Sequence, residues 1–213
     1  MTDARLQLDS TQGSWVTEDG REHLVLAADG PEGARVEIVR LGSDERLGPY
    51  GSEAVEVLVL EGTWTAPNGE LDQGGFHRGE GLALDSNRSA EGCLLLVRRL
   101  PQGVDEAVHA PNVRDAWVPG HGNLEVRPLF AEGTVSSALV RWPAGERFVP
   151  HRHFGGEEIF VLSGVFEDEH GRYPTGTWLL SPHLSEHHPF VREETLIFVR
   201  TGHMPPKPEG ARS

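Results

Sequence analysis

The sequence predicts an all-β fold built from two tandem barrel-like domains, and three observations support this prediction. The chain has 213 residues, and segments of its first half recur 102 residues later in its second half. Each half consists of short runs rich in branched and aromatic residues, separated by turn sequences such as PAG, FGG and PTG. No segment carries a capped helical period. Many short strands with regular turns are typical of a β-sandwich or a β-barrel, and this pattern occurs twice.

Three anchors define the repeat and set the expected domain boundaries. Trp15-Val16 recurs as Trp117-Val118, EVLVLEGTW (56–64) recurs as EIFVLSGVF (158–166), and CLLLVR (93–98) recurs as TLIFVR (195–200). We therefore expect one domain over residues 1–104, a polar linker over 105–116, a second domain over 117–204 and an extended tail over 205–213. Within the first domain, Asn68-Gly69 predicts a β-hairpin.

Composition restricts the partners and the compartment of the protein. The formal net charge is −14, so the surface would repel the phosphates of nucleic acids and anionic membranes. No apolar run approaches the roughly 20 residues that a membrane-spanning helix needs, and the polar N-terminus does not resemble a signal peptide. Cys93 is the single cysteine and cannot form an intrachain disulfide, as is common in a reducing compartment. We expect a cytoplasmic protein that binds neither nucleic acid nor membranes.

The stretch HRHFGGEE (151–158) indicates a metal site. Side chains two apart on a strand share a face, so His151 and His153 present both imidazoles to one point while Arg152 points away. Two glycines then allow the chain to bend and return Glu157, whose parity matches the histidines, whereas Glu158 has the opposite parity. A further ligand must come from a distant strand, and the segment SPHLSEHHPF (181–190) offers three histidines: His183, His187 and His188.

The spacing of these residues resembles the two sequence motifs of the cupin superfamily. Gly145, His151, His153, Glu157 and Gly164 match the first motif at every interval. Gly176, Pro182 and His187 match the second motif, although Leu184 and Val191 replace its usual glycine and asparagine. The resemblance implies a jelly-roll barrel in each half, and it implies that His187 is the fourth ligand in preference to His183 and His188. Over residues 117–201 the text is most similar to the ChrR-type cupin group.

The implied ligand set predicts the kind of cofactor. Three imidazoles and one carboxylate suit one divalent transition metal, above all zinc or Fe(II), with manganese, nickel and cobalt as alternatives. At the corresponding positions of the first half stand Pro49, Gly51 and Val55, so we expect that half to be a degenerate, metal-free cupin domain.

Two functions are compatible with such a site. The ChrR-type group is similar both to dioxygenases of diketones and aryl ketones and to zinc-binding cupins of anti-sigma factors. We favour an enzyme, dioxygenase-like, that acts on a small carbonyl or enol compound; the alternative is a zinc-binding sensor without catalysis. A metal-free sugar isomerase would leave the ligand spacing unexplained. Candidate lining residues are the aromatic side chains Trp142, Phe148, Phe160, Trp178 and Phe198, of which about half should face away. Both a homodimer and a pseudo-dimer within one chain are compatible with the repeat.

Overall fold

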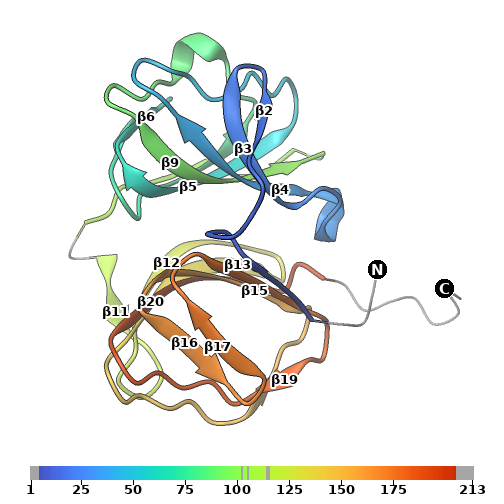
Figure 1. Ribbon diagram of the computed structural model, residues 1–213, viewed down its shortest axis with the longest axis vertical. Coiled ribbons are helices and arrows are strands. Elements are labelled where there is room, and N and C mark those ends of the chain that lie inside the picture. The colour runs from blue at the N-terminus through green and yellow to red at the C-terminus, as the bar shows by residue number, and fades with distance from the viewer. Residues whose placement is uncertain (1–4, 102, 105, 114–115, 205–213) are drawn as a thin grey trace, which may run out of the picture. The chain divides into compact units, whose positions relative to one another are not determined.

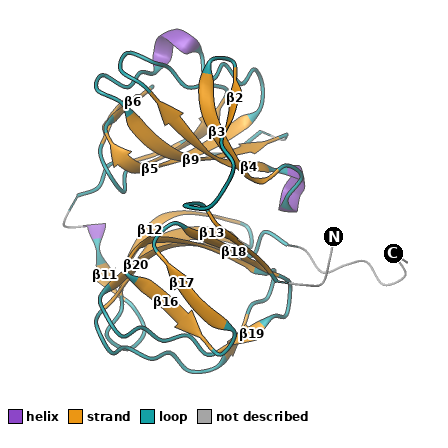
Figure 2. Ribbon diagram, in the orientation of Figure 1, coloured by secondary structure: helices purple, strands orange, loops and turns teal. Residues whose placement is uncertain are grey.

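The computed structural model describes residues 5–101, 103–104, 106–113 and 116–204, and these form two compact units of β-structure. The all-β prediction is confirmed (Figures 1 and 2). The expected tail over 205–213 lies outside the described residues. None of the described helices has the length and apolar character that crossing a membrane requires.

The first unit, residues 12–116, is built on a seven-stranded antiparallel sheet with the order β10-β8-β5-β9-β4-β3-β2. In chain order its strands are β2 (Val16–Glu18), β3 (Arg21–Ala27), β4 (Arg35–Leu41), β5 (Ala54–Gly62), β8 (Phe76–Glu80), β9 (Cys93–Leu100) and β10 (Val108–Ala110). Strands β6 (Trp64–Ala66) and β7 (Gly69–Leu71) form a separate hairpin, which confirms the turn predicted at Asn68-Gly69. Short 3-10 turns lie at Pro31–Gly33 and Leu84–Ser86.

The second unit has a sheet of the same design, with the order β1-β18-β15-β20-β13-β12-β11. Its strands are β1 (Leu6–Asp9), β11 (Val118–Pro119), β12 (Glu125–Glu132), β13 (Val135–Trp142), β15 (Glu157–Ser163), β18 (Thr177–Ser181) and β20 (Thr195–Thr201). Two smaller pairs complete the unit: β14 (His151–Arg152) with β19 (Glu186–His187), and β16 (Val165–Asp168) with β17 (Gly171–Pro174).

At one edge of each sheet lies a strand that is outside the matching segments of the repeat. In the first unit that place is taken by β10, which lies within the linker expected over 105–116 and pairs with β8. In the second unit the same place is taken by β1, which pairs with β18 over the register Leu6 to Leu180. The unit bounds therefore differ from the boundaries expected from the repeat. The three repeated segments do not predict where β1 and β10 pair, because both strands lie outside those segments.

Alternation along the strands decides what each barrel encloses. The interior of the first unit is an apolar cluster that contains Val55, Val57 and Trp64, all fully buried. The interior of the second unit contains Ile159, Val161 and their neighbours on β13, β18 and β20. Glu157 has the parity of Ile159 and Val161, so the same sheet position that holds Val55 in the first barrel holds a carboxylate in the second.

One buried histidine makes the stability of the first unit depend on pH. His77 on β8 is 4% exposed and its ring meets the Trp64 ring edge-on at 5.8 Å. Burial disfavours the imidazolium, and with a contribution from the charge of His109 it lowers the pKa of His77 from 6.5 to about 4.

We expect the unfolding free energy to be fully retained above pH 6.5 and to fall as the pH drops toward 4. In this range His77 is protonated in the unfolded chain but not in the folded chain, so acid favours unfolding. The loss should reach up to roughly 3 kcal/mol. His77→Leu should reduce this dependence, measured as the difference between urea unfolding midpoints at neutral and acidic pH. The exposed His188, changed to Gln, is the matched control. An equal pH dependence in wild type and His77→Leu would contradict the assignment.

Candidate metal centre

The pairing of two very short strands brings histidines from distant parts of the chain together. Strands β14 and β19 are antiparallel, and their register places His151 directly opposite His187. The ladder continues one step further, because the His153 amide donates to the Ser185 carbonyl at 2.9 Å and the Leu184 amide donates to the His153 carbonyl at 2.8 Å. Directly opposed residues on antiparallel strands hold their side chains about 5 Å apart, close enough to share a ligand.

Two glycines return the chain so that a carboxylate reaches the same point. Gly155 and Gly156 have φ values of +81° and +73°, which side-chain-bearing residues rarely adopt. A Cβ on Gly155 would lie 2.6 Å from the Cα of Gly202, so the turn also requires close backbone approach. Strand β15 then begins at Glu157. The bend inferred from the sequence is therefore present, and it places Glu157 beside the histidines.

Four side chains converge on one point in the second barrel. Ligand atoms of His151, His153, Glu157 and His187 all lie within 4.8 Å of one another. The Nε2 atoms of His153 and His187 are 2.9 Å apart, and Oε2 of Glu157 lies 3.3 Å from the first and 3.5 Å from the second. Oε2 is buried and has no hydrogen-bond partner among the described residues. Buried carboxylate oxygens are normally hydrogen-bonded, so an unpartnered one facing two nitrogen atoms fits a cation-binding site.

The surroundings fix the orientation of two of the imidazoles. His151 Nδ1 lies 3.0 Å from the carbonyl oxygen of Val149, and His187 Nδ1 lies 3.3 Å from Oδ2 of Asp168. A carbonyl and an ionised carboxylate accept hydrogen bonds but donate none, so each Nδ1 must carry the proton. Each Nε2 is then the atom with the free lone pair, and it is the atom suited to bind a metal.

Burial disfavours the protonated, charged forms of His151 and His153. The pKa of His153 is lowered to about 3, mainly because burial disfavours its charged form and also because His187 and His151 lie close. Burial likewise lowers the pKa of His151 and raises that of Glu157 to about 7. Although burial opposes ionisation of Asp168, hydrogen bonds from His187 and Arg5 hold its pKa well below the usual range. Burial therefore favours the neutral imidazole at His151 and His153, which is the form that ligates metals.

The aromatic residues proposed as lining separate into two groups, as alternation requires. Trp142 and Phe148 belong with the barrel interior, and the Phe148 ring lies 4.8 Å from the ring of His151. Phe160, Trp178 and Phe198 form a register row on the opposite face of the same sheet. The wall next to the four converging side chains is therefore apolar on the His151 side.

The remaining sequence candidates lie apart from the four converging side chains. Among the described residues the cluster contains neither His183, whose Nδ1 accepts the Gly155 amide, nor the exposed His188. Arg152 points outward to Glu186, at 2.9 Å. Glu158 lies on the opposite face of the sheet and accepts the indole N–H of Trp178 at 3.0 Å.

Sequence reasoning missed Asp168 and Arg5. Asp168 ends strand β16 in the turn DEHG, and Arg5 precedes strand β1. The turn sequence indicates no role for Asp168 beyond the turn itself, because the Asp168 carboxylate reaches His187 only in the folded protein.

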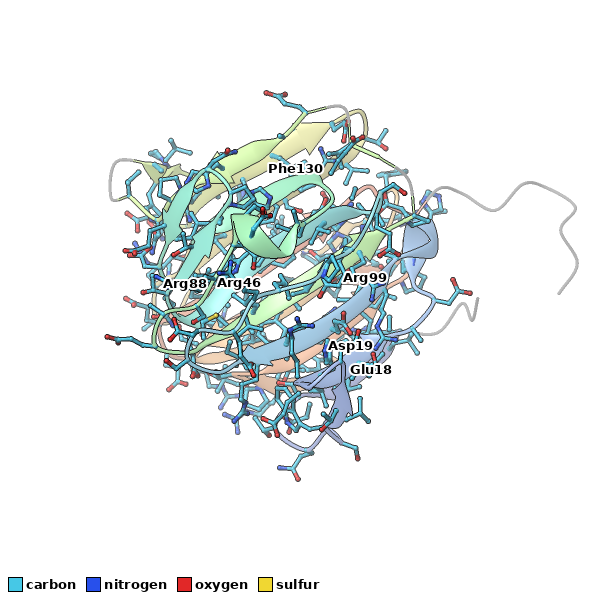
Figure 3. The ribbon with its side chains drawn as sticks, turned by 90° about the horizontal axis from the view of Figure 1, so that it is seen from above. Glu18, Asp19, Arg46, Arg88, Arg99 and Phe130 are labelled. Atoms are coloured by element: carbon cyan, nitrogen blue, oxygen red, sulfur yellow. The ribbon has the colours of Figure 1, made fainter. Side chains whose placement is uncertain are left out.

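A second group of potential ligands occurs in the first unit but has a different character. Glu18, His23 and Glu37 have ligand atoms within the same range, and Figure 3 shows Glu18 beside Asp19 at the turn between β2 and β3. Arg35 donates to Glu18 at 2.9 Å and to Glu37 at 2.8 Å. Its guanidinium already supplies the positive charge between the two carboxylates, so this group is an ion-pair network rather than a metal site.

Comparison with known proteins finds a family match for part of the chain and a shared fold. Residues 106–205 match the model of the ChrR Cupin-like domain family. A solved cupin barrel protein from Leptotrichia buccalis shares the fold, with 12% identity and a TM-score of 0.61 over 92% of this chain and 95% of that one. A comparison with curated proteins finds no match.

Solved structures share the fold over nearly the whole chain at low sequence identity. A candidate dioxygenase from Nostoc punctiforme is 14% identical, with a TM-score of 0.71 over 94% of this chain and 83% of that one. Oxalate decarboxylase from Lactobacillus farciminis, as a formate complex, is 12% identical with a TM-score of 0.67 over 97% and 88%. The nickel complex of pirin YhhW from Escherichia coli is 13% identical with a TM-score of 0.63 over 95% and 100%.

The glycine turn before Glu157 gives a test of how the site is built. Gly155→Ala combines an unfavourable positive φ with a backbone clash at Gly202, whereas Gly133→Ala has a positive φ of +58° but no atom within 4 Å of the added Cβ. We expect Gly133→Ala to cost on the order of 1 kcal/mol from backbone strain and Gly155→Ala to cost clearly more. Thermal unfolding measures both. Equal losses in the two variants would show that close approach to Gly202 does not constrain the turn.

Proposed function

We propose that this protein is a metal-dependent enzyme of the dioxygenase type, which transforms a small carbonyl or enol compound at a single site. The proposed ligands are His151, His153, Glu157 and His187. The observation that carries the proposal is the convergence of three imidazoles on a buried carboxylate oxygen that lacks any hydrogen-bond partner among the described residues.

The donor set favours transition metals. Imidazole nitrogen with one carboxylate oxygen suits zinc, Fe(II), manganese, nickel or cobalt, whereas calcium and magnesium prefer sites made of oxygen. When bound, such an ion acts as a Lewis acid toward a carbonyl or enolate oxygen. The nickel(II) complex of pirin YhhW, which shares this fold, supports a metal role for the second unit.

The protein's own residues contribute orientation and a dry wall. Asp168 and the Val149 carbonyl hold two imidazoles in the tautomer that turns Nε2 toward the site. Trp142, Phe148 and Phe166 pack together along one side, with ring centroids 5.9 and 5.6 Å apart, and exclude water from that wall. His151 is partly exposed while His153 and His187 are buried, so a small substrate would approach from the His151 side.

A second candidate function is a zinc-binding sensor without catalysis. It is favoured by the match of residues 106–205 to the ChrR Cupin-like domain. In that case the same four side chains would hold zinc in a closed site, and the protein would act by changing its contacts with a partner rather than by turnover.

The ligand set is tested by metal content. We expect protein purified without added metal to carry about one divalent transition metal per chain, and His187→Ala and Glu157→Gln to lose it, because each removes a donor from a four-residue set. His188→Ala is the matched control and should retain the metal. Mass spectrometry of the metals measures this. If His187→Ala retains metal while His183→Ala or His188→Ala loses it, the fourth ligand has been misassigned.

Oxygen uptake separates the two functions. An anaerobically purified protein loaded with iron should consume O2 only when a diketone or hydroxyketone is present, and Glu157→Gln should abolish this uptake. The enzyme proposal would be overturned if the protein held zinc tightly and showed no metal-dependent turnover of any diketone or hydroxyketone tested. The sensor function would then remain.

A further inference from the structure

Asp168 is a buried carboxylate whose two oxygens have separate partners. Oδ1 accepts the hydroxyl of Tyr173 at 2.8 Å and the backbone amides of His170 and Gly171 at 2.8 and 3.1 Å. Oδ2 accepts Nη1 of Arg5 at 2.6 Å and faces Nδ1 of His187 at 3.3 Å. The side chain of Asp168 is fully buried, so these contacts determine its position.

Arg5 reaches this carboxylate because β1 pairs into the sheet of the second unit. It immediately precedes β1, the strand that completes the sheet of the second unit by pairing with β18. It is separated from Asp168 by 163 positions in the sequence. The guanidinium also lies over the ring of Tyr173, 4.9 Å from its centroid, so a second contact holds it at Asp168.

We propose that Arg5 is a positioning residue for His187: by holding Oδ2 of Asp168 it keeps the proton on Nδ1 and the lone pair of Nε2 directed at the metal site. The inference rests on the proposed metal site for its effect on affinity. Without Arg5, Asp168 would remain anchored through Oδ1 alone, and Oδ2 would lose its fixed place opposite His187. The imidazole would then populate its other tautomer, in which Nε2 carries the proton and cannot ligate.

The first strand therefore takes part in the site as well as in the sheet. The repeat offers a comparison, since β10 fills the equivalent sheet position in the first unit, where Val55 stands at the place of Glu157. In the second unit the edge strand is β1, and the Arg5 guanidinium just before it acts on His187 through Asp168.

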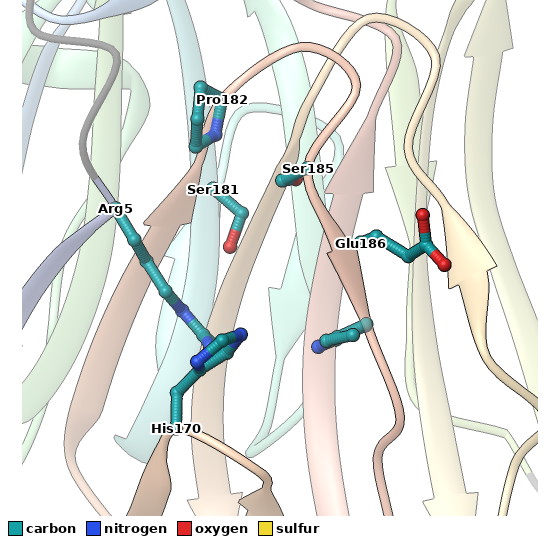
Figure 4. Close-up of a pocket in the computed structure, with 7 residues that line it drawn as sticks. Arg5, His170, Ser181, Pro182, Ser185 and Glu186 are labelled. Carbon is teal, nitrogen blue, oxygen red and sulfur yellow. The ribbon is translucent and has the colours of Figure 1, made fainter.

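A cavity beside Arg5 makes the proposal open to chemical rescue. It has a volume of about 260 Å³ and is lined by Arg5, His170, Ser181, Pro182, Ser185, Glu186 and His187. Figure 4 shows Arg5 extending toward His170 while the carboxylate of Glu186 points away from both. A small guanidinium compound is of a size to enter this space when the Arg5 side chain is removed.

The direct test is the tautomer of His187 in metal-free protein, read from the nitrogen chemical shifts of its imidazole. We expect wild type to be mainly protonated on Nδ1, and Arg5→Met to show a larger share of the form protonated on Nε2. Zinc affinity, measured by competition with a chelator, should fall roughly 10- to 100-fold in Arg5→Met. Arg5→Lys should lie between the two, because lysine keeps the charge but not the planar fork.

The matched control is Arg172→Met. Arg172 lies on β17 and bonds Glu167, the neighbour of Asp168, at 2.9 Å, so its loss removes a similar ion pair from the same hairpin. It should leave both the tautomer and the zinc affinity unchanged. In an Asp168→Ala background, Arg5→Met should have no further effect on either quantity, since the two residues act through one contact.

Two further measurements complete the experiment: chemical rescue of zinc affinity in the variants, and the pairing of β1 with β18 in each of them. Methylguanidinium should restore part of the zinc affinity of Arg5→Ala and none of that of Asp168→Ala. Amide shifts of Leu179 and Leu180 on β18 report whether β1 remains paired in each variant. A wild-type tautomer and affinity in Arg5→Met, with β1 paired, would overturn the inference. If wild type itself binds no metal, the proposed function fails, while the tautomer comparison still decides the role of Arg5.

Discussion

The antiparallel contact between His151 and His187 is the interaction on which the candidate site depends. These residues belong to strands of two residues each, which bond to each other rather than to the seven-stranded sheet. Their pairing sets two imidazoles opposite each other, and the two-residue periodicity of a strand then adds His153. Glu157 comes into reach because a glycine turn separates it from the histidines and starts the next strand inside the barrel.

The two barrels show how little of the sheet has to change for a site to appear or be lost. Both sheets have the same strand order, and both position equivalent strands by the same ladders. In the first, the interior position of Glu157 is held by Val55 within a continuous apolar cluster. Replacing a buried carboxylate and its partners with apolar residues removes a desolvation cost, so a barrel without a ligand set is an ordinary stable solution.

The site has an outer layer that links it to the beginning of the chain. Asp168 faces one proposed ligand, and Arg5, which immediately precedes β1, donates to Asp168. Strand β1 belongs to the second unit by hydrogen bonding and to the first half by sequence. The pairing of β1 into the sheet of the second unit therefore does more than extend that sheet. It connects the pairing of β1 to the geometry around His187, so a change at Arg5 or in β1 is expected to alter the proposed metal site.

The sequence by itself determined the all-β fold, the repeat and three of the four converging residues, His151, His153 and Glu157, because the alternation of side chains along a strand is a local property. It left the choice among His183, His187 and His188 to a resemblance, and it contained no signal for Asp168 or Arg5. Those required the tertiary structure, since Asp168 meets His187 across 19 positions of the sequence and Arg5 meets Asp168 across 163. The choice of β1 as an edge strand in the second unit, and of β10 in the first, was likewise decided only by hydrogen bonding across each sheet.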